Sequence, residues 1–389
     1  MIGCSARPVT SLYVHVPFCA RKCEYCAFYS ETPAGEAADR YVAALIREME
    51  LVAHELRPGT VFFGGGTPSL LNLRQWEQIV TAMQRLKLLG AAEWTVECNP
   101  ATVSLDKGKL LRAAGVNRIS MGVQSLDEDL LDRLGRVHSR GMVFRSFDLL
   151  RQAGFGNINL DLMFAIPGQT MKTWRQTLNE ALELGSEHLS CYEVIYEEDT
   201  PLFAQLQAGR FDIDEELACA MYEELIECAE QHGFHQYEVA NFARHLCGSR
   251  TDLPNHACRH NVNYWRGGEF YGLGPAATGY VHGVRTKNWS NTVLYCEQLE
   301  RGRRAIEWTE QLPPLARAGE TAAFGLRMNA GWPFEQFRET TGFELRQEWS
   351  ADMNRLVERG WGLIEASRFR LTRRGLRFAD AAAEQFLRS

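Results

Sequence analysis

Three cysteines stand close together near the start of the chain, in the stretch CARKCEYC. Cys19, Cys23 and Cys26 have the spacing C-x3-C-x2-C and follow an apolar run at residues 12–18. Thiolates are soft ligands that suit zinc or iron–sulfur clusters. A structural zinc site requires four protein ligands, and no fourth cysteine follows at short spacing. Three thiolates can instead hold a four-iron cluster that keeps one iron free. The alternative is a set of three buried structural cysteines.

The composition limits the class of protein. The chain has 389 residues, of which 45% are hydrophobic, so it can bury the core of one large domain and a smaller one. Its net charge of −7 argues against a general nucleic-acid or membrane-surface binder, although peripheral membrane contact stays open. Eleven scattered cysteines favour a reducing cytoplasm over a disulfide framework. Residues 1–10 lack the apolar segment of a secretory signal, so we expect a cytoplasmic protein.

The first 200 residues alternate strand and helix patterns. Strands are expected at residues 12–16, 60–63, 94–97, 118–123, 157–164 and 188–194, and helices at 37–56, 76–89, 105–114, 128–134, 142–153 and 173–184. This alternation favours a parallel sheet with crossover helices. Six rounds are too few for an eight-stranded barrel, so the fold class predicted is α/β, with a partial (βα)6 barrel.

Residues suited to ligand binding follow several of these expected strands, where barrels carry their chemistry. The glycines of GGGTP at residues 64–68 let backbone groups approach a ligand closely. Glu97, Gln124 and Asp161 could bond to hydroxyl or ammonium groups. Arg136 could pair with a ligand carboxylate, or it could be a helix C-terminal cation on a solvated face.

These residues together resemble the family of oxygen-independent coproporphyrinogen III oxidases and their relatives, within the radical S-adenosylmethionine (SAM) superfamily. The matching motifs are Tyr13, HVPFC at 15–19, Cys23, Cys26, GGGTP, Glu97 before Asn99-Pro100, SMGVQS at 120–125, Arg136, DLM at 161–163 and PGQT at 167–170. The resemblance implies that Cys19, Cys23 and Cys26 hold a [4Fe–4S] cluster whose free iron binds SAM. It also implies that SAM is surrounded by Tyr13, Tyr25, Gly65, Gly66, Thr67, Glu97, Gln124, Arg136, Asp161 and Ile195.

Two features indicate one branch of that family. Phe28 stands where the porphyrinogen-oxidising enzymes carry a further cysteine, and residues 260–265 read HNVNYW, similar to the H-N-x-x-Y-W motif of the HemW branch. Resemblance to that branch implies a protein that binds haem and delivers it to apo-haemoproteins. His260 could be an axial ligand to haem iron, with Tyr264 and Trp265 as flat apolar faces. The alternative is a histidine that caps a turn beside an aromatic cluster.

The function expected from this resemblance is that of a haem chaperone. The cluster and SAM would control its state, with a homodimer as one such state. The competing function is oxidation of coproporphyrinogen III by a deoxyadenosyl radical, and Phe28 counts against it. A third, weaker alternative is a radical SAM enzyme that acts on an unrelated small substrate.

The chain also departs from the HemW pattern. Ala27 and Tyr29 flank Phe28 where Asp and Asn are usual, and the segment before His260 is longer than usual. That segment contains Cys247, His256, Cys258 and His260, of which the last three would share one face of an extended chain. We hypothesise a second metal or haem-ligand site there. The alternative is an irregular surface loop, because the spacing matches no standard zinc pattern.

The expected domains are residues 1–300, a barrel with a haem-motif extension at about 200–300, and residues 301–389. A helix at 345–358, a hairpin at 362–371 and a helix at 372–386 resemble a winged-helix module, which makes the C-terminal domain α+β. The hairpin and last helix carry a basic patch, Arg368, Arg370, Arg373, Arg374 and Arg377. The acidity of the whole chain disfavours a nucleic-acid partner. Two alternatives remain for this patch: a solvated surface, or a surface that binds haem propionates or a recipient protein.

Overall fold

The structure, a computed structural model, describes residues 8–245 and 253–388. The chain divides into two compact units. We call residues 1–228 with 269–310 the barrel unit, and residues 229–268 with 311–389 the C-terminal unit. The division expected from the sequence differs in two segments, since it leaves residues 229–268 with the barrel and assigns residues 301–310 to the C-terminal domain. Residues 229–268 contribute a hairpin and a helix to the C-terminal unit instead, and residues 301–310 belong to the barrel unit.

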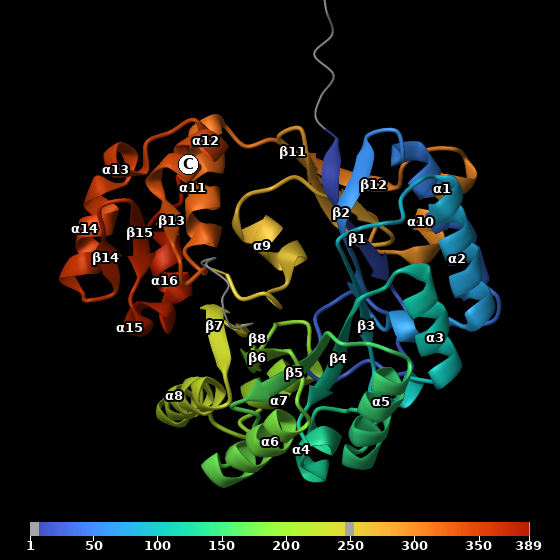
Figure 1. The fold of residues 1–389 in the computed structure, drawn as a ribbon, viewed down its shortest axis with the longest axis horizontal. Coiled ribbons are helices and arrows are strands. Elements are labelled where there is room, and N and C mark those ends of the chain that lie inside the picture. The colour runs from blue at the N-terminus through green and yellow to red at the C-terminus, as the bar shows by residue number, and fades with distance from the viewer. Residues whose placement is uncertain (1–7, 246–252, 389) are drawn as a thin grey trace, which may run out of the picture. The chain divides into compact units, whose positions relative to one another are not determined.

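Six parallel strands of the barrel unit lie side by side in chain order (Figure 1). They are β1 (Val9–Val16), β2 (Leu56–Gly65), β3 (Glu93–Cys98), β4 (Arg118–Gln124), β5 (Ile158–Phe164) and β6 (His188–Glu193). A further strand, β9 (Tyr271–Leu273), pairs in parallel with β1. The helices between the strands are α1 (Ala37–Val52), α2 (Leu73–Arg85), α3 (Leu105–Ala114), α4 (Glu128–Arg133), α5 (Arg140–Gln152) and α6 (Met171–Glu183). The predicted partial (βα)6 barrel is confirmed.

Local sequence accounts for the ends of these elements. The helix predicted over residues 37–56 ends at Val52, because Leu56 already pairs in β2 and the residue before Pro58 is biased to extended backbone. Helix α2 begins earlier than predicted, since Asn72 and Gln75 form a capping box. Gly115 ends α3 in the left-handed conformation, with φ of +108°.

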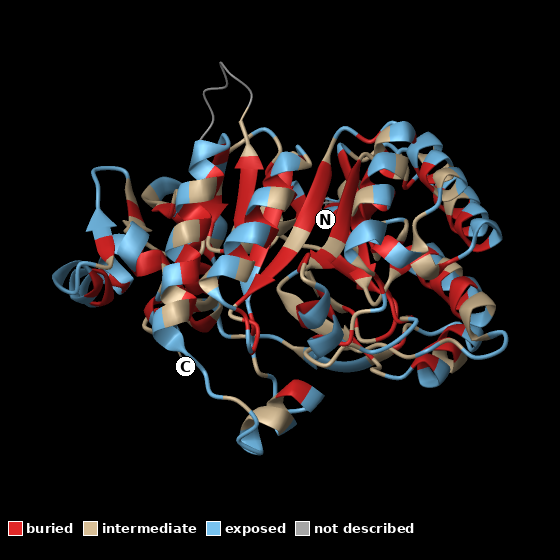
Figure 2. Ribbon diagram, turned by 90° about the horizontal axis from the view of Figure 1, so that it is seen from below, coloured by how far each residue is buried: buried red, intermediate tan, exposed pale blue. Residues whose placement is uncertain are grey.

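The core of the barrel unit lies between the sheet and the helices. The strands are buried almost throughout, as parallel strands covered by helices should be (Figure 2). Helix α1 turns a stripe that includes Tyr41, Leu45, Met49 and Val52 inward, at the spacing of an amphipathic helix. No described helix has the length and apolar character needed to cross a membrane.

Residues 269–310 return to the barrel unit after the two helices α7 (Pro201–Gln207) and α8 (Glu215–Gln231). They form β9, helix α10 (Thr292–Glu300) and an antiparallel sheet of β10 (Thr278–Val281), β11 (Val284–Asn288) and β12 (Ile306–Glu310). The buried carboxylate of Glu48 in α1 accepts hydrogen bonds from the Gly274 N–H at 2.9 Å, Asn288 Nδ2 at 2.8 Å and the Tyr295 hydroxyl at 2.7 Å. One side chain therefore holds three parts of the returning segment.

The C-terminal unit contains a three-stranded antiparallel sheet packed with helices. Its first elements are the hairpin β7 (Phe234–Glu238) and β8 (Asn241–Arg244), helix α9 (Arg259–Trp265) and helix α11 (Pro314–Gly325). Then follow β13 (Trp332–Pro333), α12 (Phe334–Thr341), α13 (Leu345–Glu348), α14 (Ser350–Glu358), β14 (Gly362–Ile364), β15 (Arg368–Leu371), α15 (Arg373–Leu376) and α16 (Ala379–Glu384). The predicted small α+β domain and its hairpin are confirmed.

Both long helices predicted for this unit are wrong in length. Residues 345–358 form two helices, because Trp349 leaves helical geometry with φ of −120° and its indole N–H donates to the Phe386 carbonyl at 2.8 Å. Residues 372–386 also form two helices, separated at Phe378, whose ring stacks on Trp361 at 4.7 Å. Aromatic side chains make contacts at both breaks, at a buried Trp349 and at a partly exposed Phe378.

The basic patch of this unit is partly neutralised. Arg370 donates to Glu365 at 2.7 Å, and Arg368 lies 3.9 Å from the same carboxylate. Arg373 lies 3.9 Å from Glu230. These pairs support the interpretation of a solvated face.

Replacing Glu48 with Ala should destabilise the barrel unit. The substitution leaves three buried donors without their acceptor, which costs roughly 3 kcal/mol or more of the free energy of unfolding. Chemical denaturation followed by circular dichroism measures the loss. Glu50→Ala in the same helix is the control, since exposed Glu50 pairs only with Arg85 at the surface and should cost less than about 1 kcal/mol. Equal losses in both variants would contradict this role of Glu48.

Candidate functional site

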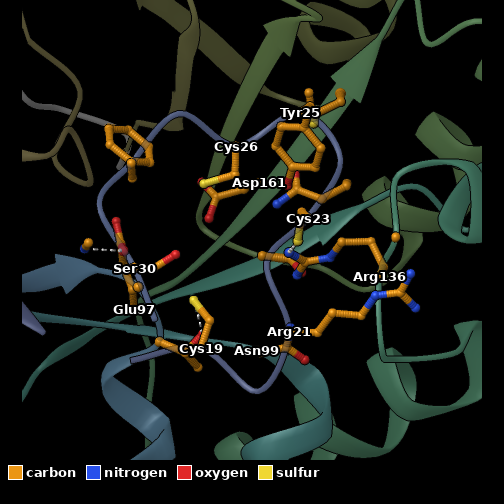
Figure 3. A pocket seen from close by; sticks show the side chains of 18 of the residues that line it. Cys19, Arg21, Cys23, Tyr25, Cys26, Ser30, Glu97, Asn99, Arg136 and Asp161 are labelled. Carbon is orange, nitrogen blue, oxygen red and sulfur yellow. Dashed lines mark hydrogen bonds between the residues drawn. The ribbon is translucent and has the colours of Figure 1, made fainter. Parts of the chain in front are cut away.

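A cavity of about 470 Å³ opens at the carboxyl ends of the barrel strands (Figure 3). The structure brings twelve of the fourteen predicted site residues together around it: Cys19, Cys23, Tyr25, Cys26, Gly65, Gly66, Thr67, Glu97, Gln124, Arg136, Asp161 and Ile195. They come from the loop after β1, the turn after β2 and the ends of later strands. Parallel strands place these ends at one rim, which is why residues far apart in the chain meet here.

Tyr13 and His260 do not line this cavity. The Tyr13 hydroxyl lies 3.1 Å from Nδ1 of His15, and His15 Nε2 lies 2.8 Å from the Tyr29 carbonyl. Since a carbonyl only accepts, Nε2 carries the proton, and Tyr13 donates to Nδ1. Burial lowers the pKa of His15 to about 4, so the ring is neutral. Tyr13 thus holds the His15 ring, and His15 in turn holds the Tyr29 backbone, three residues after the last cysteine of the loop.

The three cysteines lie on an irregular loop between β1 and α1, and they point toward the cavity (Figure 3). All three are free thiols and partly exposed, so the alternative of three buried structural cysteines is wrong. Two neighbouring side chains hold the sulfur atoms. Arg136 Nη1 donates to Cys23 Sγ at 3.4 Å, and the Thr67 hydroxyl lies 3.5 Å from Cys19 Sγ.

This set of thiols fits an iron–sulfur cluster better than a single ion. Among the described residues, no three His, Cys, Asp or Glu side chains converge closely enough to bind one metal ion. In a cluster each thiolate binds a different iron, so the sulfur atoms need not meet at one point. The donors from Arg136 and Thr67 are of the kind that offset thiolate charge.

The GGGT turn, residues 64–67, is held against the start of the cysteine loop. The Gly66 N–H donates to the Val16 carbonyl at 2.8 Å, and the Thr67 N–H donates to the Phe18 carbonyl at 2.7 Å. A Cβ atom on Gly66 would lie 2.7 Å from the Phe18 oxygen. Gly65 has φ of +99°, and a Cβ there would overlap the His15 ring. The approach is so close that both positions require glycine.

Two carboxyl groups with raised pKa values face the cavity. Glu97 accepts from the Gly65 N–H at 3.2 Å; burial, together with the charge of Asp161, raises its pKa to about 8. Asp161 accepts from Asn159 Nδ2 at 2.8 Å; burial raises its pKa to about 6, although the charge of Arg118 opposes the shift. Near neutral pH the free cavity therefore holds a protonated Glu97 beside an ionised Asp161.

Arg136 and Gln124 are fixed at the end of β4. Arg136 Nη2 donates to the Gly122 carbonyl at 2.6 Å, while its other nitrogen reaches Cys23. The alternative of a solvated helix-end cation is therefore wrong. Gln124 has φ of +67°, which is unusual for a residue other than glycine, at a register shift between β4 and β5. Such backbone strain concentrates at functional sites.

Several residues of the site were not predicted. Ser30, Asn99, Ser120, Tyr192 and Glu193 also line the cavity. Ser120 bonds to Asp161 at 3.2 Å. The period-two alternation along β4 and β5 places Ser120 and Asp161 on inward positions, and that signal could have identified Ser120.

The HNVNYW motif forms most of helix α9 in the C-terminal unit. His260 is only 1% exposed, and its Nε2 lies 2.7 Å from the Tyr264 hydroxyl. The ring of Trp265 lies near Phe324, with centroids 6.3 Å apart, and near the Arg327 guanidinium at 4.9 Å. His260 thus sits beside aromatic side chains, as the structural alternative for this motif describes.

The hypothesised second metal site does not form among the residues that can be described. The expectation of an extended chain is wrong, because residues 259–265 are helical, and His256, Cys258 and His260 do not converge on a metal position. Cys258 is buried at the start of α9, and its N–H donates to the Tyr237 hydroxyl at 3.1 Å. Cys247 lies outside the described residues.

Comparison with known proteins connects this geometry to a family. A family model described as "Radical SAM superfamily" matches residues 13–181, and one described as "HemN C-terminal domain" matches residues 312–378. "Heme chaperone HemW" of Bacillus subtilis is 35% identical over 383 residues, which cover 97% of this chain and 99% of that protein. The chain belongs to the HemW family.

Other relatives agree with this assignment to HemW. "Heme chaperone HemW" of Escherichia coli is 37% identical over 281 residues, covering 70% of this chain and 71% of that protein. The solved structure of coproporphyrinogen III oxidase (HemN) from E. coli, a radical SAM enzyme, has a TM-score of 0.83 and covers 98% of this chain and 90% of that chain. Its sequence identity is 21%, so this likeness shows that the HemW chain shares the fold.

The substitution Gly66→Ala should loosen the cysteine loop of this HemW chain. The added methyl group overlaps two backbone oxygens and should cost roughly 1–3 kcal/mol of the free energy of unfolding. Denaturation curves measure the cost, and the iron content after anaerobic reconstitution should fall as well. Gly59→Ala is the control, because its Cβ would lie 3.6 Å from the nearest heavy atom. Normal stability and iron content in Gly66→Ala would refute the steric argument.

Glu97→Gln should change how stability depends on pH. The folded parent binds the Glu97 proton more tightly than the unfolded chain does, so its stability falls as pH rises from about 4.5 to 8. The variant lacks this titration. Its free energy of unfolding, measured without ligands, should match that of the parent at pH 5 and exceed it by roughly 2–4 kcal/mol at pH 9. An equal difference at both pH values would rule out the raised pKa.

Proposed function

We propose that this chain is a haem chaperone that binds a [4Fe–4S] cluster, SAM and haem, and that delivers haem to apo-haemoproteins. One observation carries the proposal: three accessible thiols, a glycine turn and two buried carboxyl groups face one cavity. The names of its relatives, which include several heme chaperones, support the haem part. The proposed location is the cytoplasm, and a homodimer is the proposed regulated state.

Cys19, Cys23 and Cys26 would hold the cluster, which when bound supplies an open iron position and an electron. The residues around it have their own tasks. Arg136 donates to the Cys23 sulfur and would offset the charge of the thiolates. The Thr67 hydroxyl, 3.5 Å from the Cys19 sulfur, would donate to that sulfur once it is ionised. The Arg136 side chain is fixed by the Gly122 carbonyl and the Thr67 backbone by the Phe18 carbonyl, so both residues would orient the sulfur atoms before the cluster binds.

The remaining groups suit SAM, which carries hydroxyl, ammonium and carboxylate groups. Gly65 and Gly66 line the cavity with backbone that a ligand could contact. Asp161 can accept from ribose hydroxyls, and Glu97 can accept from an ammonium group once it loses its proton. A cationic ligand would favour that loss, because it lowers the pKa of a carboxyl group beside it.

Haem requires an apolar surface as well as an iron ligand. Phe28 is 68% exposed and Ile195 is 67% exposed, and both lie at the cavity, together with Val137 and Tyr192. Phe28 also replaces the cysteine of the oxidising enzymes, which supports a chaperone over an oxidase. In α9, His260 can ligate iron through Nε2 only if this nitrogen separates from the Tyr264 hydroxyl.

An anaerobic haem titration of the cluster-loaded protein tests the proposal. Saturable binding, followed in the Soret region, is expected for the parent. With His260 as the ligand, His260→Ala should weaken binding about tenfold or more and change the spectrum, whereas Tyr264→Phe removes the hydroxyl that lies against Nε2 and should keep or tighten binding. Phe28→Ala should also weaken haem binding if the exposed apolar side chains at the cavity contact haem. Val293→Ala, at an exposed apolar position of α10, is the control.

The competing function is coproporphyrinogen III oxidation. It predicts anaerobic, SAM-dependent turnover of coproporphyrinogen by the parent, with no specific haem affinity. That result would overturn the chaperone proposal. Transfer of bound haem to an apo-haemoprotein, monitored by its absorbance, would support it.

A further inference from the structure

A row of polar side chains crosses the sheet directly beneath Asp161. In the parallel register Glu97 of β3 pairs with Ser120 of β4, Ser120 with Asn159 of β5, and Asn159 with His188 of β6. Asp161 itself lies one inward position farther along β5. Four neighbouring strands of a buried sheet thus place polar groups where parallel strands are usually apolar.

Asn159 is the centre of this row. Its Nδ2 donates to Asp161 Oδ1 at 2.8 Å and to Ser120 Oγ at 2.7 Å. Its Oδ1 accepts from Ser190 Oγ at 3.1 Å and lies 2.6 Å from His188 Nδ1. Asn159 is 1% exposed and does not line the cavity, so it cannot contact a ligand there.

These partners determine which way the amide points. A carboxylate only accepts hydrogen bonds, so the amide N–H groups must face Asp161. The amide oxygen then faces Ser190 and His188, and Nδ1 of His188 must carry a proton to donate to it. The reversed amide would set its oxygen against the carboxylate. Ser190 and His188 therefore hold Asn159 in the orientation that Asp161 requires.

We propose that Asn159, held by His188 and Ser190, is a positioning residue that fixes the Asp161 carboxylate for SAM binding. The inference rests on the SAM part of the proposed function. The charged or titratable groups that face Asp161 are Arg118 on β4, Glu97 and Cys98 on β3, Cys191 on β6 and Tyr25 of the cysteine loop. Ser120 and Ser190 also bond to Asp161, so without Asn159 the carboxylate loses one of three side-chain donors, is held less firmly and keeps its proton to higher pH.

The test is the SAM affinity of the cluster-loaded protein from pH 5.5 to 8.5, measured anaerobically by calorimetry. Asn159→Ala should weaken binding about tenfold at pH 7. The midpoint at which affinity is lost on acidification should also move to higher pH. Asn288→Ala is the matched control. Asn288 is another asparagine that is 1% exposed and bonds to a buried carboxylate, but it lies away from the cavity. It should lower stability and leave affinity and midpoint unchanged.

A second pair of variants covers the case in which Asn159→Ala does not fold. His188→Asn keeps an N–H donor near the position of Nδ1 and should retain the midpoint of the parent, whereas His188→Leu should shift it. Unchanged affinity and midpoint in Asn159→Ala, or in both His188 variants, would overturn the inference while leaving SAM binding intact. A parent that binds no SAM would overturn the SAM part of the proposed function as well.

Discussion

The close contact between the GGGT turn and the end of β1 is the constraint on which the site depends. Two backbone hydrogen bonds, from Gly66 to Val16 and from Thr67 to Phe18, fix the first residues of the cysteine loop to the neighbouring strand. Thr67 then reaches the Cys19 sulfur, and Gly65 leaves room for the His15 ring. Because glycine alone fits there, the loop gains a defined position without any helix or strand of its own.

Two buried carboxyl groups, whose desolvation is only partly offset by hydrogen bonds and by Arg118, give the cavity its chemical character. Burial raises the pKa of both Glu97 and Asp161, and the charge of Asp161 adds to the rise at Glu97, while Arg118 limits both rises. Arg136 adds a cation between the cysteine loop and β4. A ligand with a positive charge would favour ionised Glu97 beside Asp161, so the cavity suits a cation better than an anion.

The HNVNYW motif shows a different balance. Its histidine is buried and paired within one helical turn, since residues four apart face each other on a helix. A ligand cannot reach Nε2 of this histidine until that pair opens. If the motif handles haem, the exposure of His260 must therefore increase, and the Tyr264 hydroxyl is one group that opposes the change.

The sequence by itself determined the strand and helix order, the cysteine spacing and the glycine turn, because these depend on local spacing and backbone geometry. Its motifs, together with the family resemblance, identified twelve residues that meet at one cavity, where parallel strands end at a common rim. Tertiary structure decided the rest. The register of β3 to β6 placed Ser120, Asn159 and His188 beside Asp161. Helix formation over residues 259–265 removed the shared extended face expected for His256, Cys258 and His260. Packing placed residues 229–268 in the C-terminal unit. Such pairings depend on contacts between distant residues, which no local pattern encodes.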